Sequence, residues 1–258
     1  MSVTTTADRL IPQPRNPDDG SPTMTKPIVA QYRDRLSGCT FVAATPAGQP
    51  QLWESYLRGA GVSYRRHGVE SVLEYDCIVD GNSTALFFVA LNPAGAVVGG
   101  MRVQGPYSMS VQAHAISEWD GRQGTTELHE EISGRIADGV IEMKTGWVDD
   151  TAGNRRELTD ALARIFVHSL RLMQVRWALG TVAQHAVRRW QTTGGVVSDQ
   201  VSPVAYPDER YRTVPMWWDR ENFAELAVPE QLPLIMHEAA QLDAVAARGR
   251  DDIERVSC

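Results

Sequence analysis

The chain has 258 residues, enough for one large domain or two small ones with a substantial core. Its net charge of -7 provides no global basic field, which excludes recruitment to nucleic acid or to an anionic membrane by overall charge. No apolar run in the sequence approaches the ~20 residues that a membrane-spanning helix needs.

Cysteine and histidine usage points to a reduced protein without a metal centre. Cys39, Cys77 and Cys258 are odd in number and widely spaced, which favours free thiols over a disulfide framework. The N-terminus lacks the basic, apolar and small-residue progression of a signal peptide, so we predict a cytoplasmic protein. The histidines form no HxH or HExxH pair, and we expect no metal site.

The first half of the chain predicts a tail, a helix and a hairpin. Residues 1–30 are rich in Thr, Ser, Pro and Asp without periodicity, which predicts a disordered tail. A helix is expected over residues 49–60, and a polar, carboxylate-rich connection follows over residues 63–81. Two apolar runs then flank the turn signal N-P-A-G at residues 92–95, which predicts a β-hairpin. Residues 104–139 are polar and glycine-rich, with room for one short helix.

The second half alternates strands and helices. Val140–Asp149 is a predicted strand, although Glu142 and Lys144 lie on the same side of it. Residues 155–174 carry apolar side chains at i, i+3, i+4 and i+7, which predicts a long amphipathic helix. The remaining predicted elements are a strand over 176–183, a helix ending at Gly194-Gly195, strands over 196–206 and 210–218, and an amphipathic helix over 228–248.

This order of elements predicts an α/β fold with mixed strand directions. We expect one domain over residues 31–225, between the tail and a C-terminal segment at 226–258 whose helix packs on the domain or extends it. The order from Gln49 to Trp218 resembles the GNAT acyltransferase superfamily. That resemblance implies a mixed central sheet flanked by helices, in which two splayed strands form a cleft for an acyl thioester.

A loop motif carries part of this resemblance. The superfamily pattern Arg/Gln-x-x-Gly-x-Gly/Ala is similar to R-E-L-T-D-A at residues 156–161, with Thr159 in place of the first glycine. In the superfamily, backbone N–H groups at this helix start bind the pyrophosphate of the thioester cofactor, as helix N-termini favour anions. The donor-binding residues that the resemblance implies are Trp147, Val148, Arg155, Arg156, Thr159 and Ala161.

A narrower resemblance covers Tyr64 to Asp149. This stretch is similar to acyl-homoserine-lactone (autoinducer) synthases and long-chain N-acyl amino acid synthases, which carry three motifs in a fixed order. The matching residues are Glu74-Tyr75-Asp76, Gly99-Gly100-Met101-Arg102, and Glu142 with Val148-Asp149. The resemblance implies transfer of a fatty acyl group from acyl-CoA or an acyl carrier protein to a small amine or amino acid.

Two departures from the families stand out. Lys144-Thr145 occupies the place of a Ser-Arg pair, so the arginine is lost at its own position. Two alternatives stay open: Lys144 substitutes for it as a point charge, or the site no longer performs the chemistry of the family. Trp190 occupies the place of the tyrosine that protonates the leaving thiolate in ordinary GNAT enzymes, and an indole cannot act as that acid. The autoinducer synthases also manage without this tyrosine.

The chemistry implied by the resemblance assigns roles to four residues. A carboxylate held in an apolar strand retains a proton more readily than an exposed one, which suits Glu142 as the general base, directly or through a water. Glu74, Asp76 and Arg102 would bind the ammonium and the carboxylate of the acceptor. Backbone N–H groups at a bulge near Gly146 would hold the oxyanion.

Structural alternatives remain open for these residues. Glu142 can equally form a cross-strand ion pair with Lys144 or Arg102, and Arg102 can serve as a structural partner of Glu74 or Asp76. A carrier protein is acidic, so its docking would use a basic patch formed by Arg155, Arg156, Arg164, Arg188 and Arg189. At the level of the whole protein, the alternatives are a general acetyl-CoA-dependent acetyltransferase and a catalytically silent thioester-binding protein.

Overall fold

The computed structural model of the chain describes residues 30–243. The predicted tail lies outside the described residues except for Ala30, which begins the first strand, and so do the last residues of the predicted C-terminal helix. Within residues 30–243, no helix has both the length and the apolar character needed to cross a membrane.

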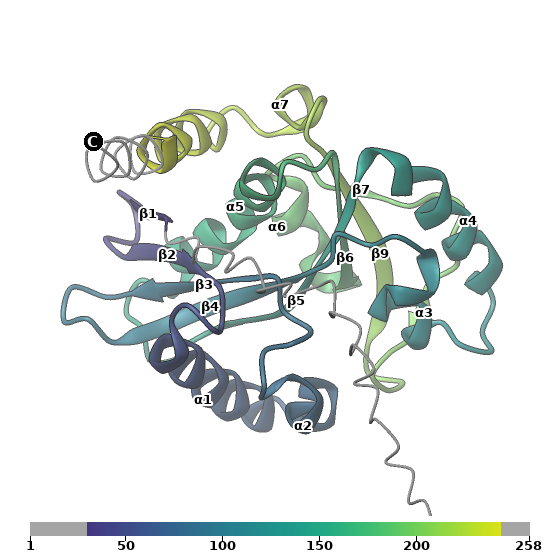
Figure 1. The fold of residues 1–258 in the computed structure, drawn as a ribbon, viewed down its shortest axis with the longest axis horizontal. Coiled ribbons are helices and arrows are strands. Elements are labelled where there is room, and N and C mark those ends of the chain that lie inside the picture. The colour runs from purple at the N-terminus through teal and green to yellow at the C-terminus, as the bar shows by residue number, and fades with distance from the viewer. Residues whose placement is uncertain (1–29, 244–258) are drawn as a thin grey trace, which may run out of the picture.

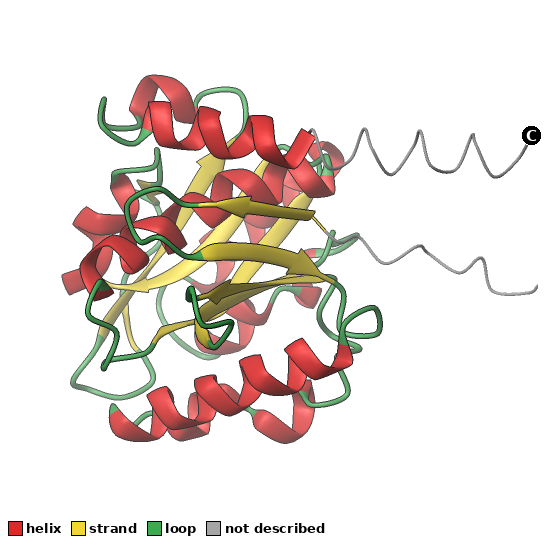
Figure 2. Ribbon diagram, turned by 90° about the vertical axis from the view of Figure 1, so that its left-hand side faces the viewer, coloured by secondary structure: helices red, strands yellow, loops and turns green. Residues whose placement is uncertain are grey.

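A nine-stranded mixed sheet forms the centre of the molecule (Figures 1 and 2). Its strands are β1 (Ala30–Arg33), β2 (Thr40–Ala44), β3 (Leu86–Leu91), β4 (Val97–Gln104), β5 (Val140–Val148), β6 (Trp177–Ala183), β7 (Val196–Val197), β8 (Val204–Ala205) and β9 (Arg212–Asp219). Their order is β1-β2-β3-β4-β5-β6-β9-β7, with β8 also paired to β9. Neighbours are antiparallel except for β5 and β6, which run parallel.

Helices cover both faces of the sheet. They are α1 (Pro50–Arg66), α2 (Tyr75–Ile78), α3 (His114–Glu118), α4 (Thr125–Arg135), α5 (Arg155–Met173), α6 (Val187–Gln191), α7 (Phe223–Leu226) and a C-terminal helix at 232–243. Figure 1 shows α1 and α2 on one face, with α5, α6 and the C-terminal helix on the other. The α/β prediction is therefore confirmed, with the sheet between two helical layers.

Apolar side chains build a core on each face. α5 buries Leu158, Leu162 and Ile165 in the largest cluster, and Ile235 and Leu242 of the C-terminal helix join them. α1 buries Trp53, Tyr56 and Leu57 against β2, β3 and Trp147. α3 and α4 cover the β6–β9 end through a third cluster that includes Trp119, Leu128 and Trp217.

The predicted hairpin is confirmed as β3 and β4. Asn92 Oδ1 accepts hydrogen bonds from the N–H groups of Ala94 and Ala96, both at 3.0 Å, and Gly95 takes the positive φ of 81° that closes the turn. The long helix α5 and the strands β6 and β9 also lie where the sequence predicts them.

Three predicted elements differ from the structure. The first helix, α1, continues beyond residue 60 to Arg66, and residues 104–139 contain the two helices α3 and α4 instead of one. The strand predicted over 196–206 is two short strands, β7 and β8, because the chain turns at Ser198. The Ser198 hydroxyl accepts the N–H groups of Gln200 and Val201 there, and residues that bond this way interrupt a strand.

Candidate functional site

The parallel pair β5 and β6 separates halfway along its length. Pairing runs from Val140 with Trp177 to Met143 with Gly180 and then stops. β5 continues beside β4, and β6 continues beside β9 as far as Ala183. Because each strand follows its outer neighbour, the sheet opens between them, and a cavity of about 480 Å³ lies in the opening. The predicted splay of these strands is confirmed.

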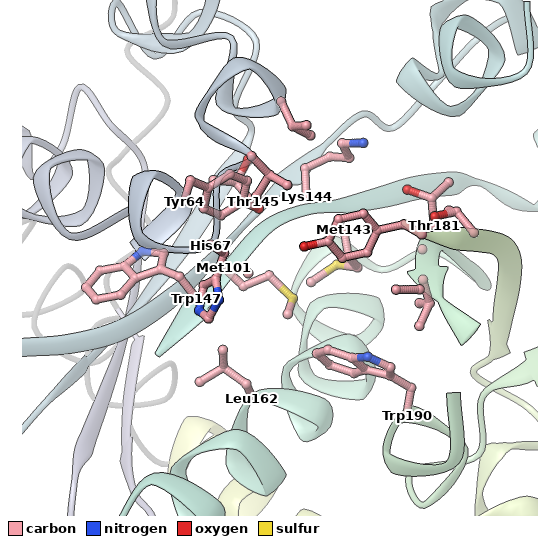
Figure 3. Close-up of a pocket in the computed structure, with 18 of the residues that line it drawn as sticks. Tyr64, His67, Met101, Met143, Lys144, Thr145, Trp147, Leu162, Thr181 and Trp190 are labelled. Carbon is pink, nitrogen blue, oxygen red and sulfur yellow. The ribbon is translucent and has the colours of Figure 1, made fainter. Parts of the chain in front are cut away.

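The cavity has an apolar part and a polar end (Figure 3). Residues from both faces line it, so it passes through the sheet at the point of separation. The apolar lining includes Met101, Met143, Leu162, Phe166 and Trp190. The polar lining includes Tyr64, Glu118, Lys144, Thr181 and Tyr206. A polar end beside an apolar channel suits a ligand with a reactive head and a hydrocarbon chain.

A bulge in β5 sets the shape of this opening. Arg102 of β4 pairs with Lys144 and Gly100 pairs with Trp147, so Thr145 and Gly146 together oppose the single residue Met101. Thr145 has φ of 53°, a left-handed conformation that a β-branched residue rarely adopts. The bulge predicted near Gly146 is confirmed.

Two hydrogen bonds hold Thr145 in that conformation. The Tyr56 hydroxyl donates to the Thr145 carbonyl at 2.7 Å, and Arg102 Nε donates to Thr145 Oγ1 at 3.2 Å. The extra residue reverses the alternation of side chains along the strand. Trp147 therefore packs against α1.

Five charged or titratable side chains meet at the polar end of the cavity, and we call them the cavity cluster: Glu74, His114, Glu118, Glu142 and Lys144. The Lys144 ammonium contacts Glu118 Oε1 directly and lies 3.7 Å from Glu142 Oε1. His114 Nδ1 lies 3.1 Å from Glu118 Oε1, and its Nε2 lies 3.0 Å from Glu74 Oε2. Only Glu118 and Lys144 of this cluster line the cavity.

The cavity cluster fixes two opposite charges on the cavity wall. Burial alone would raise the pKa of Glu118. The Lys144 charge and hydrogen bonds from His114 and Lys144 outweigh this effect and lower the pKa to about 2. Burial lowers the pKa of Lys144, while Glu118 and Glu142 raise it well above its usual value. At neutral pH the cavity wall therefore carries a carboxylate and an ammonium.

His114, Glu118 and Glu142 also offer three metal-ligand atoms within 4.8 Å of one another. Lys144 already contacts Glu118 and stands near Glu142, so its ammonium supplies the positive charge there. A second cation at these atoms would be repelled by it. The cluster fits a lysine-centred ion network better than a metal centre.

Glu142, to which the resemblance assigns the role of general base, does not line the cavity. Its side chain is fully buried and accepts the backbone N–H groups of His114 at 2.7 Å and Ala115 at 3.0 Å. The Tyr107 hydroxyl adds a third hydrogen bond at 2.9 Å. These donors turn the carboxylate toward the start of α3, where it holds that helix against β5.

The other three residues predicted to act on the acceptor lie at different distances from the cavity. Glu74 joins the cavity cluster through His114. Asp76 lies exposed on α2 and is not brought to the cavity. Arg102 is buried behind Thr145, and among the described residues its Nη1 has no hydrogen-bond partner. Arg102 therefore forms no ion pair with Glu74 or Asp76 in the part of the chain that the structure describes.

Of the residues predicted to bind the acyl donor, some line the cavity and others do not. Trp147, Val148, Arg155 and Thr159 line the cavity, the last two from the first turns of α5. Ala161 is buried in the core below, and Arg156 is exposed outside the lining. Arg155 lies 2.8 Å from Asp150, so its charge is partly neutralised at the helix start.

The predicted basic patch loses one of its five arginines. Arg164 is wholly buried and pairs with Asp34 and Glu238. Arg189 pairs with Asp160 at 2.9 Å. The prediction that Arg164 lies on the surface was wrong because carboxylates from two distant segments surround this position.

Sequence reasoning missed His114, Glu118 and Tyr206. His114 and Glu118 stand at i and i+4, a spacing that places them on one face of a helix. That spacing was a usable signal, but no local pattern reveals that Glu118 meets Lys144, which lies 26 positions away. Tyr206 comes from the segment between β8 and β9, and burial followed by the charge of Glu118 raises its pKa to about 12.

Comparison with known proteins identifies relatives by sequence and by fold. No protein-family model matches the chain. Uncharacterized proteins of Mycobacterium tuberculosis and Mycobacterium bovis are 43% identical over 204 residues, which is 79% of this chain and 78% of theirs.

Solved structures share the fold at low sequence identity. The N-acyl amino acid synthase FeeM from uncultured soil microbes matches with a TM-score of 0.52 at 10% identity, covering 70% of this chain and 92% of FeeM. The CoA-dependent acyl-homoserine-lactone synthase BjaI gives a TM-score of 0.48 at 14% identity, over 80% of this chain and 87% of that one. The chain has the GNAT fold that the sequence predicted.

Proposed function

We propose that this chain, which belongs to the family of these uncharacterized mycobacterial proteins and has the GNAT fold, is an N-acyltransferase. It would move a fatty acyl group from a thioester to the amine of a small molecule or amino acid. The observation that carries the proposal is the opening of β5 from β6, which holds a cavity with an apolar channel and a charged wall.

The donor side of the cavity suits a thioester with a phosphorylated carrier. The first turn of α5 lies beside the cavity. The backbone N–H groups at the start of a helix attract phosphate oxygens. Arg155 adds a side-chain donor at the same end, where Thr159 also lines the cavity. Coenzyme A supplies such a phosphate group, and so does the prosthetic arm of an acyl carrier protein. Exposed Arg155 and Arg156 offer the basic surface that an acidic carrier would need.

The polar end suits an amine acceptor. The ionised Glu118 carboxylate attracts an ammonium, and its Oε2 is buried without a hydrogen-bond partner among the described residues. If the acceptor is an amino acid, we assign its carboxylate to Arg102, whose Nη1 has no hydrogen-bond partner among the described residues but lies behind Thr145, outside the cavity lining. Glu74 would act on the acceptor from the α2 side through His114.

The reaction requires one bond to form and one to break. The neutral amine attacks the thioester carbonyl, the C–N bond forms, and the C–S bond breaks to release a thiolate. We assign the removal of the amine proton to the cavity cluster, with Glu142 acting through Lys144 and Glu118 or through a water. We assign the stabilisation of the developing oxyanion to backbone N–H groups at the bulge. Tyr206 keeps its proton at neutral pH and lines the cavity, so it can supply the proton that the thiolate takes up. The proton taken from the amine then restores the Tyr206 phenol and completes the cycle.

Turnover with defined donors tests the proposal. The full chain is incubated with CoA thioesters from acetyl to palmitoyl and with a panel of amino acids and amines, while thiol release and the amide product are followed by mass spectrometry. We expect amide formation with a preference for fatty donors. A preference for acetyl-CoA would identify a general acetyltransferase. Donor binding without product for any acceptor would identify a silent binding protein, and absence of donor binding would contradict the proposal outright.

Replacing Glu142 separates its two proposed roles. Glu142→Gln lowers turnover by at least about 100-fold if the carboxylate takes part in proton removal. If Glu142 only anchors α3, the variant loses stability while turnover per folded molecule and its pH profile stay near those of the wild type.

A further inference from the structure

A second cavity adjoins the first at Trp147. It has a volume of about 410 Å³ and lies between α1 and the β3–β4 hairpin end, next to the loop after β5. Three residues line both cavities: Ser63, Trp147 and Val148. Trp147 has by far the largest side chain of the three, so its indole forms most of the wall between the two spaces.

The backbone and α1 hold the Trp147 indole in this place. The bulge at Thr145 and Gly146 turns the side chain toward α1, where only 6% of the residue is exposed. The ring lies against Gly59, since a Cβ at that position would come within 2.0 Å of its Cη2 atom. Glycine at residue 59 therefore leaves the space that the indole occupies.

The chemistry of the second cavity suits a hydrocarbon chain with a solvent-facing end. Leu52, Val62 and Val97 supply apolar surface to its lining, and Gly59 adds space without a side chain. Val62 is 53% exposed, an apolar residue left uncovered at this site. Arg58, Arg66, Asp149 and Asp150 supply the charged part of the lining. The apolar surface favours burial of methylene groups of a hydrocarbon chain, while the charged groups beside it remain at the solvent-facing side.

We propose that Trp147 determines acyl-chain length by closing the passage from the cavity between β5 and β6 into the second cavity. This inference rests on the proposed acyltransferase function. In the wild type, a chain that enters the opened sheet ends against the indole. Without the indole, a longer chain continues between α1 and β4 and buries additional methylene groups there.

The test measures chain-length profiles for wild type, Trp147→Phe and Trp147→Ala. Affinity for CoA thioesters from acetyl to palmitoyl is measured by calorimetry, and thiol release is measured with an acceptor that the wild type uses. We expect the ratio of long-chain to short-chain affinity to rise about tenfold or more in Trp147→Ala, because each buried methylene contributes appreciably to binding. Trp147→Phe keeps an aromatic ring against α1 and is expected to shift the profile less.

A second substitution makes the result specific to the second cavity. Val62→Trp adds a large ring at that cavity without touching the cavity between the strands, so alone it leaves the chain-length profile unchanged. Combined with Trp147→Ala, it refills the passage and restores the wild-type preference.

Three outcomes are informative in different ways. An unchanged profile in folded Trp147→Ala and Trp147→Phe overturns the inference while leaving the acyltransferase proposal intact. A profile shifted by Trp147→Ala but unaffected by Val62→Trp also overturns it, because the added length then lies elsewhere. If no thioester binds the wild-type chain, the proposed function fails and the inference falls with it.

Discussion

Two buried ion networks lie on opposite sides of this sheet, and only one of them reaches a cavity. The cavity cluster stands at the polar end of the opening between β5 and β6. The other network, which we call the sealed cluster, joins α5 to the C-terminal helix and to the turn between β1 and β2. Its members are Asp34, Arg164, His168, Gln231 and Glu238, each at most 8% exposed.

The sealed cluster uses nearly all of its hydrogen-bonding capacity. Arg164 donates from Nη2 to Asp34 at 2.6 Å, from Nη1 to Gln231 at 2.9 Å, and from Nε to both oxygens of Glu238. His168 Nε2 lies 2.8 Å from Glu238, while its Nδ1 has no partner among the described residues. These hydrogen bonds join segments more than 60 positions apart in the sequence, so the sealed cluster stabilises the fold.

The cavity cluster differs in having an open side. Glu118 and Lys144 line the cavity, Glu118 Oε2 is unpartnered among the described residues, and the neighbouring Arg102 keeps a free Nη1. Buried charges with unused hydrogen-bonding capacity beside a cavity are poised to meet a ligand. Of the two networks, the cavity cluster presents charged side chains to the cavity between β5 and β6, whereas the sealed cluster does not line it.

The largest expected effect belongs to the sealed cluster. Arg164→Met leaves Asp34 and Glu238 buried without their cation, and we expect the free energy of unfolding to fall by about 4 kcal/mol. Urea denaturation measures this loss. Arg58→Met is the matched control, because Arg58 pairs with Glu54 on the surface, and it should produce no measurable change. A loss in Arg164→Met as small as in the control would contradict the structural role of the sealed cluster.

An intermediate effect is expected at Glu118, with a defined pH dependence. Glu118→Gln should lower the free energy of unfolding by about 3 kcal/mol at neutral pH, because the folded state holds the pKa near 2, below the usual 4.5. Because the pKa of Glu118 is lower in the folded state, the ionised carboxylate stabilises the fold fully at any pH above its pKa in the unfolded chain. This stabilisation is lost as pH falls toward 2. The difference between wild type and Glu118→Gln should therefore shrink as pH falls from about 4.5 to about 2.

Urea midpoints of both proteins across this range measure the shrinkage. A difference that stays constant with pH would show that Glu118 is not the titrating group. Turnover distinguishes the two networks further, since Glu118→Gln should also reduce acyl transfer per folded molecule, whereas Arg164→Met should not.

The sequence predicted more of the scaffold than of the site. Periodicity located α5 and the turn signal located the hairpin, because both are local patterns. The order of motifs along the chain identified the fold. The partners of Glu142 and Lys144 are set by α3, in a region whose sequence shows little periodicity. The strand alternation placed both side chains on one face correctly, but it could not show that α3 takes Glu142 and leaves Lys144 to the cavity.

The smallest effect is expected at the edge of the cavity cluster. Glu74 is partly exposed and contacts the other members of the cavity cluster only through His114. Glu74→Gln should change the free energy of unfolding by less than about 1 kcal/mol, as exposed ion pairs contribute little. A kinetic effect confined to the KM of the acceptor would support its predicted role there, while loss of stability comparable to Glu118→Gln would place Glu74 among the buried structural charges.

The central claim is that the acyl donor binds between the separated ends of β5 and β6. Thr181 lines that opening from β6, after the last residue paired with β5 (Figure 3). Calorimetric titration of a fatty acyl-CoA into wild type and Thr181→Trp tests the claim directly. We predict that the added ring weakens donor binding by about tenfold or more while the urea midpoint stays near that of the wild type. Equal affinity for the donor in both folded proteins would contradict the claim.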